Sequence, residues 1–175
     1  MENIIQRMLR AARLDVNLYE EVEADRTATG QAMAVVVMSA VAAGVGTMAH
    51  GGMGNLFAAA IGALISWYVW ALLTYLIGTK LLPEANTHAD LGELLRTIGF
   101  ASSPGLIRVL GIIPGLGGIV FMAASVWMLV AMVIAVRQAL DYSSTGRAVA
   151  VCLVGWVVQA LILVSIMSML GGPVS

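Results

Sequence analysis

Long apolar stretches separated by short polar segments dominate the chain after residue 30. They cover about residues 31–49, 56–82, 94–112, 114–136 and 147–170. A helix needs about 20 apolar residues to cross the hydrocarbon core of a bilayer, and each stretch is close to or above that length. The pattern therefore predicts an all-α fold, a polytopic helical membrane protein with five transmembrane helices. Residues 31–175 form the membrane domain in this interpretation.

The first 30 residues have a different pattern and are predicted to form an amphipathic segment at the membrane interface. At 100° per residue, one face of a helix over residues 2–23 is apolar (Ile4, Ile5, Met8, Leu9, Ala12, Val16 and Tyr19), and the opposite face is polar (Gln6, Arg7, Arg10, Arg13 and Asn17). Leu14 and Asp15 violate this pattern. The basic face makes Arg7, Arg10 and Arg13 candidates for contact with lipid headgroups. The alternative is a helix that packs on its own membrane domain.

The third stretch is interrupted by Pro104, which is preceded by Ser102 and Ser103. Proline breaks a helical hydrogen bond, and lipid tolerates this only where nearby groups satisfy the freed backbone. Both serines can bond such carbonyls, which is a structural role, or they can line a polar cleft. Arg108 follows at membrane depth, where an arginine is costly. We therefore expect Arg108, Ser102, Ser103 and Pro104 to contact a lipid or a partner. The alternative is that Arg108 merely extends to the interface.

Small residues in the second stretch predict close helix packing. Ala58, Gly62 and Ser66 are spaced four residues apart, which places them on one helix face. Trp127, in the middle of the fourth stretch, is also predicted to pack between helices.

Charge is scarce and unevenly distributed. Only 11% of the 175 residues are charged, against about 25% in soluble domains, and 60% are hydrophobic. These values exclude a soluble protein, and a net charge of −1 gives no basic surface for nucleic acid. With five spans, all Lys and Arg residues except Arg108 fall on one side (Arg7, Arg10, Arg13, Arg26, Lys80, Arg96, Arg137 and Arg147). The rule that basic loops stay inside predicts a cytoplasmic amino terminus and an external carboxyl terminus.

No catalytic or cofactor motif accompanies this pattern. His50 and His88 lie on opposite sides of the membrane in the predicted topology, so they cannot share a metal. The glycine-rich segment 115–118 lacks the Lys-Ser/Thr of a phosphate loop. We expect no enzyme, no metal and no cofactor. The pattern favours an accessory, scaffold or membrane-organising protein that contacts lipids and either a membrane-protein partner or its own copies. A small transporter or channel is the first alternative, and a fixed subunit of a larger complex is the second.

Several segments resemble the Yip family of Ypt/Rab-interacting proteins. Tyr19, Val22 and Asp25 in LYEEVEAD resemble the aromatic, aliphatic and acidic positions of the family's entry motif, although the usual preceding proline is absent. LRTIGFASSP, at residues 95–104, is similar to the family's entry to the third span. IPGLG at 113–117, VWML at 126–129 and AVRQAL at 135–140 resemble its fourth span and exit. The resemblance covers about residues 15–170.

The resemblance implies a five-span membrane domain with a cytoplasmic amino terminus, in agreement with the charge argument. Eukaryotic members bind Rab GTPases and help to organise membranes. This chain is similar to the prokaryotic members, which have a short amino-terminal region and no established reaction. The resemblance therefore implies location in the cytoplasmic membrane of a prokaryote, and it does not extend to a Rab-related role.

Overall fold

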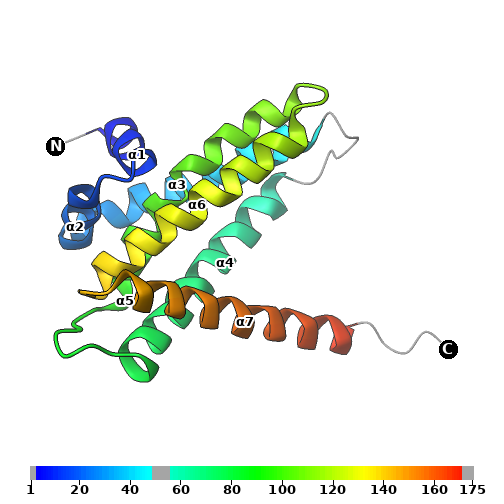
Figure 1. Cartoon of the computed structure of the whole chain (residues 1–175). Coiled ribbons are helices and arrows are strands. Elements are labelled where there is room, and N and C mark those ends of the chain that lie inside the picture. The colour runs from blue at the N-terminus through cyan, green and yellow to red at the C-terminus, as the bar shows by residue number, and fades with distance from the viewer. Residues whose placement is uncertain (1–2, 49–55, 171–175) are drawn as a thin grey trace.

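The computed structural model describes residues 3–48 and 56–170, and all regular structure in these residues is helical. In chain order the elements are α1 (Ile4–Ala12), α2 (Val16–Ala24), η1 (Arg26–Ala28), α3 (Thr29–Thr47), α4 (Leu56–Leu76), η3 (Ile77–Leu81), α5 (Leu91–Ala101), η4 (Ser103–Ile112), α6 (Gly117–Ala139) and α7 (Thr145–Leu170). The 3₁₀-helix η4 packs on both α3 and α6, and in Figure 1 the helices α4 and α7 cross below it. The all-α prediction is confirmed.

Four of the described helices are long and apolar enough to cross a membrane. They are Arg26–Thr47, Leu56–Leu81, Gly117–Ala139 and Thr145–Ile162. The predicted third span differs from these because it consists of two elements, α5 and the 3₁₀-helix η4, with Ser102 between them. Neither element is long enough to span a bilayer alone. Pro104 lies in the first turn of η4, where its missing N–H is tolerated.

The predicted single helix over residues 2–23 is divided into two in the structure. Leu14 has a left-handed backbone, with a φ of 62°, and α2 begins after Asp15, whose carboxylate accepts from the Asn17 N–H at 3.0 Å. An N-terminal carboxylate cap starts a new helix at that point. Leu14 and Asp15, the two residues that violated the amphipathic pattern, therefore mark the break.

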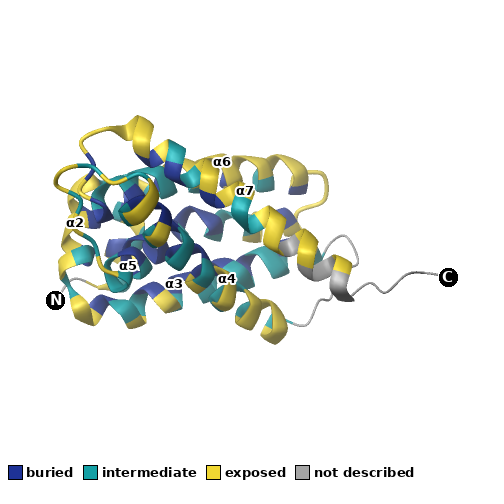
Figure 2. Ribbon diagram, turned by 90° about the horizontal axis from the view of Figure 1, so that it is seen from below, coloured by how far each residue is buried: buried dark blue, intermediate teal, exposed yellow. Residues whose placement is uncertain are grey.

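Helices α1 and α2 pack on the membrane helices. Ala11, Leu18, Tyr19 and Val22 are fully buried, and Figure 2 shows buried residues gathered where α2, α3 and α5 meet. The indole N–H of Trp127, midway along α6, donates to the Ala12 carbonyl at 2.7 Å. Of the two alternatives for this segment, the structure thus has the helices packed on their own domain.

The closest helix packing joins α3 to α5 and η4, which run parallel to it. Gly99, Gly105 and Gly111 are six residues apart, and a side chain at each would meet Ala32, Ser39 and Gly46 respectively, which are seven residues apart on α3. Seven residues span about two turns and 10.5 Å of α-helix, whereas six span two turns and about 12 Å of 3₁₀-helix. The 3₁₀ geometry therefore aligns glycines with one face of α3.

This packing predicts that a side chain at Gly99 destabilises the domain. A Cβ there would lie 2.7 Å from the Ala32 Cβ and 3.1 Å from its backbone oxygen. Gly99→Val should therefore cost about 1–3 kcal/mol of stability through overpacking. Gly62→Val is the matched control, since nothing lies within 4 Å of a Cβ at that position. Unfolding of the purified variants in mixed micelles of increasing SDS content measures the difference. Equal stability of the two variants would contradict the packing described.

Candidate functional site

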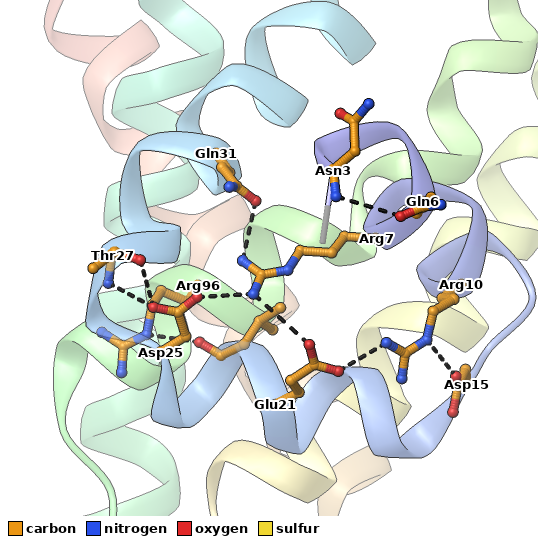
Figure 3. Close-up of polar contacts among 11 residues, drawn as sticks. Asn3, Gln6, Arg7, Arg10, Asp15, Glu21, Asp25, Thr27, Gln31 and Arg96 are labelled. Atoms are coloured by element: carbon orange, nitrogen blue, oxygen red, sulfur yellow. Dashed lines mark hydrogen bonds and ion pairs between the residues drawn. The ribbon is translucent and has the colours of Figure 1, made fainter. Parts of the chain in front are cut away.

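Helices α1 and α2 form an amino-terminal layer. It is held together by a network of hydrogen bonds and ion pairs around Arg7 (Figure 3). Arg7 Nη2 lies 2.8 Å from Asp25 Oδ2, and Arg7 Nη1 donates to Gln31 Oε1 at 3.1 Å. Asp25 also accepts from the hydroxyl and the N–H of Thr27. These bonds, the Thr27 hydroxyl first and then the guanidinium, hold the pKa of Asp25 below its usual value. Arg7 is only 7% exposed, so its charge is turned into the protein.

The other two candidate basic residues of α1 are placed differently. Arg10 Nε donates to Asp15 Oδ2 and Arg10 Nη1 to Glu21 Oε2, each at 2.8 Å. Arg13 follows α1 and is exposed. Ile5 and Leu9 are also exposed, at 60% and 54%. The structure thus directs Arg7 and Arg10 toward α2, and it leaves Arg13 with two apolar side chains at the surface of the layer.

Arg96 joins this layer to the membrane helices, a role that the sequence analysis missed. Its Nε donates to the Val22 carbonyl at 2.9 Å, and its guanidinium also bonds the Glu23 carbonyl. These carbonyls belong to the last turn of α2, which carries no basic residue of its own. A cation at that position satisfies free carbonyls and complements the helix dipole. The absence of a basic residue in this turn was a weak signal that another segment supplies one.

A cavity of about 560 Å³ lies between α3, α4, α6 and α7. Ser102 and Arg108 contribute to its wall, with Ser39, Ser66 and Ser125 as further polar side chains. Ser103 and Pro104 are buried beside it and do not line it. The Ser103 hydroxyl donates to the Phe100 carbonyl at 2.7 Å, and the Ser102 hydroxyl lies 3.5 Å from the Ile98 carbonyl. Ser103 therefore has a structural position, whereas Ser102 lies in the cavity wall.

Arg108 is the only charged residue among the described residues in the wall of this cavity. Its Nη2 lies 3.4 Å from Ser125 Oγ, and its Cζ lies 5.8 Å from the centre of the Phe121 ring. Its Nε is buried without a hydrogen-bond partner, and no carboxylate of the described residues forms an ion pair with it. An unpaired buried donor costs about 1–3 kcal/mol, and more when charged. The chain alone thus leaves this cation incompletely satisfied.

The three predicted packing residues are not equivalent in the structure. Gly62 and Ser66 lie on an exposed face of α4, and nothing is within 4 Å of a Cβ at Gly62. Gly62 therefore makes no close helix contact within the described chain, whereas Ser66 lines the cavity. Trp127 is 39% exposed and joins α6 to the end of α1.

Residues 17–167 match the family model of the Yip1 domain. The chain belongs to the Yip1 domain family. The match confirms the resemblance and, together with the apolar helices, identifies an integral membrane protein. No curated protein and no solved structure is significantly similar to the chain. The Yip1 domain begins in α2 and ends within α7, so α1 precedes it.

The three residues of the entry motif, Tyr19, Val22 and Asp25, have structural roles in this Yip1 domain. Tyr19 and Val22 are fully buried, and the Tyr19 hydroxyl donates to the Ala11 carbonyl at 3.3 Å. Asp25 pairs with Arg7 and caps η1 through the Thr27 N–H. The three motif positions thus hold α2 on the core and join it to α1 and α3.

Glu23 lies beside this motif in a polar pocket with three other carboxylates, those of Glu20, Glu93 and Asp141. Burial raises the pKa of Glu23 to about 7, with Asp141, Glu93 and Glu20 adding to the effect and Arg96 opposing it. The folded Yip1 domain therefore favours the protonated form of Glu23.

This raised pKa predicts a pH-dependent stability. Because the folded pKa of about 7 exceeds the ordinary value of 4.5, ionisation of Glu23 opposes folding, and stability should fall as pH rises from about 4.5 to 7. Glu23→Gln should remove most of this dependence, whereas the exposed neighbour Glu20→Gln should retain it. Thermal unfolding at pH 5 and pH 8 provides the measurement. An equal fall in Glu23→Gln and in the parent would refute the assignment to this carboxyl.

Proposed function

We propose that this Yip1 domain crosses the membrane five times, with α5 and η4 together forming the third span. The parallel packing of α5 and η4 along α3 supports this topology, since the first and third spans of a five-span protein run in the same direction. The basic residues outside the spans support a cytoplasmic amino terminus and an external carboxyl terminus. The resemblance to prokaryotic members supports location in the cytoplasmic membrane of a prokaryote.

We further propose that the protein is a non-enzymatic accessory, scaffold or membrane-organising factor that acts through lipid and helix contacts. The observation that carries this proposal is the second half of α7, which diverges from α6 (Figure 1). Trp156, Val157, Leu161 and Val164 on it are 60–65% exposed. A helix that is apolar around most of its circumference needs lipid or another helix on that surface. The partner is a membrane protein or a second copy of this chain.

Two other functions are retained as alternatives. A small transporter or channel is favoured by one observation, the cavity with Arg108 in its wall, because buried charges mark transport paths in many membrane proteins. A fixed subunit of a larger complex is compatible with the exposed surface of α7. The three functions differ in whether the protein moves a solute across the membrane and in whether it requires a permanent partner protein.

The topology predicts that single cysteines at Leu116 and Asn86 label from opposite sides of the membrane. Leu116 lies just before α6 and is 41% exposed, and Asn86 lies in the connection between η3 and α5 and is exposed. Each is introduced in a Cys152→Ala background and treated with an impermeant maleimide in intact cells and in inside-out vesicles. Leu116→Cys should react in cells and Asn86→Cys in vesicles. Reaction of both from the same side would exclude five spans.

The scaffold function predicts a discrete partner at α7. A photo-crosslinking residue placed at Trp156, which is 62% exposed, should capture one protein or a second copy of the chain in native membranes. The matched control is the same residue at Trp70, which is 8% exposed and should give no intermolecular product. Mass spectrometry of the crosslinked band identifies the partner. Only lipid adducts at Trp156 would contradict a protein contact at this surface.

A further inference from the structure

The cavity below Arg108 is polar at one end and apolar at the other. Ser125 and Met132 both line it from α6, and they lie seven residues apart, or about 10.5 Å along the helix. Arg108 reaches toward Ser125 at the polar end. At the other end, the indole N–H groups of Trp67 and Trp70 are engaged by the Leu95 carbonyl and the Met132 sulfur. The indoles therefore present mainly hydrocarbon to the cavity.

The cavity opens toward the surroundings between α6 and α7. Leu129, Leu153 and Trp156 line it and are nevertheless 50–62% exposed. Val36, Ser39 and Ala40 of α3 and Ile98 of α5 also line it. In a membrane, this opening gives access from the lipid phase.

The charge of the cavity is complementary to an anion. The guanidinium of Arg108 lines the cavity without an ion-pair partner among the described residues, and none of the described residues that line the cavity is acidic. A guanidinium has five donors and binds phosphate or carboxylate through paired hydrogen bonds. A volume of about 560 Å³ is within the range of about 300–1,000 Å³ found for small-molecule sites.

We propose that this cavity binds an anionic phospholipid, with the phosphate on Arg108 and Ser125 and one acyl chain along the wall formed by Trp67, Trp70 and Met132. The proposal rests on the function proposed above and names the lipid contact. A Cβ on Gly46, one residue before the end of α3, would meet the Arg108 carbonyl. In the proposed topology this places the phosphate near the external end of α3 and directs the acyl chain toward the middle of the membrane.

Tryptophan fluorescence tests the proposal, because three of the four tryptophans line the cavity. Trp127→Phe and Trp156→Phe in the full chain leave Trp67 and Trp70, each 8% exposed, as reporters. The protein in detergent is titrated with phosphatidylglycerol whose acyl chains carry bromine, a quencher of nearby indoles. Phosphatidylcholine with the same chains and a brominated fatty acid provide the comparisons.

We expect saturable quenching by phosphatidylglycerol at a mole fraction roughly tenfold below that needed for phosphatidylcholine. Both lipids offer a phosphate to the guanidinium, but only phosphatidylglycerol has a net negative charge, since the choline cation, which Arg108 repels, neutralises phosphatidylcholine. Arg108→Gln should bring the two curves together, Arg108→Lys should retain part of the difference, and Arg26→Gln, an exposed arginine outside the cavity, should retain all of it. If Arg108→Gln fails to fold, Arg108→Lys and Ser125→Ala serve as the test variants. Both should show a smaller preference for phosphatidylglycerol over phosphatidylcholine than the parent does.

Equal curves for the two phospholipids in the parent would overturn the proposal. An undiminished preference in Arg108→Gln, or stronger quenching by the fatty acid than by phosphatidylglycerol, would also overturn it. The outcome is separate from that of the proposed function. Lipid selectivity without a protein partner at Trp156 would support this site alone, whereas a partner at Trp156 without lipid selectivity would support the scaffold function alone.

Discussion

The close approach of α3 to the parallel pair α5 and η4 is the constraint on which the rest of the membrane domain depends. Glycines at positions 99, 105 and 111 face α3, and side chains there would collide with Ala32, Ser39 and Gly46. A ten-residue 3₁₀-helix is unusual, since such runs seldom exceed about 3–4 residues. Here the tighter helix keeps its glycines on the contacting face. The same contact places the Arg108 backbone against Gly46, so that the side chain extends to Phe121 and Ser125 on α6.

A second connection joins the amino-terminal layer to this core through Arg96. Its guanidinium bonds the last carbonyls of α2, and it lies within the segment that resembles the family's entry to the third span. The entry motif of the Yip1 domain is on the other side of this contact, with Tyr19 and Val22 buried in the core. The two motif segments are far apart in sequence and meet in the structure. In this chain the two motif segments thus form an interface between the layer and the membrane helices.

The sequence predicted the helical class and four of the spanning helices because length and apolarity decide them directly. It also predicted the interruption at Pro104, since proline removes a backbone donor. It did not predict that η4 is a 3₁₀-helix, because that geometry goes with the fit of Gly105 and Gly111 to α3, a contact between distant segments. Helical periodicity located the basic face of α1 but did not show whether that face points into the protein or toward the lipid headgroups. Arg7 faces inward because Asp25 and Gln31, distant in sequence, bind its two terminal nitrogens there.

Contacts between distant segments explain the remaining differences for the candidate site. Gly62 and Ser66 have the spacing of a packing face, yet Gly62 faces open space and Ser66 faces the cavity. The cavity is formed by residues from α3, α4, α5, η4, α6 and α7, so no local pattern reveals it. Only Arg108 was a clear signal in the sequence, because a charge in an apolar stretch requires a partner.

We propose that this Yip1 domain acts by contact with lipids and partner helices and moves no solute. Flux through liposomes that contain the purified full-length protein tests this claim most directly. Release of an entrapped small anionic dye and movement of monovalent ions down a gradient should equal those of protein-free liposomes. A selective, protein-dependent flux that Arg108→Gln abolishes would contradict the account and establish a transporter or channel.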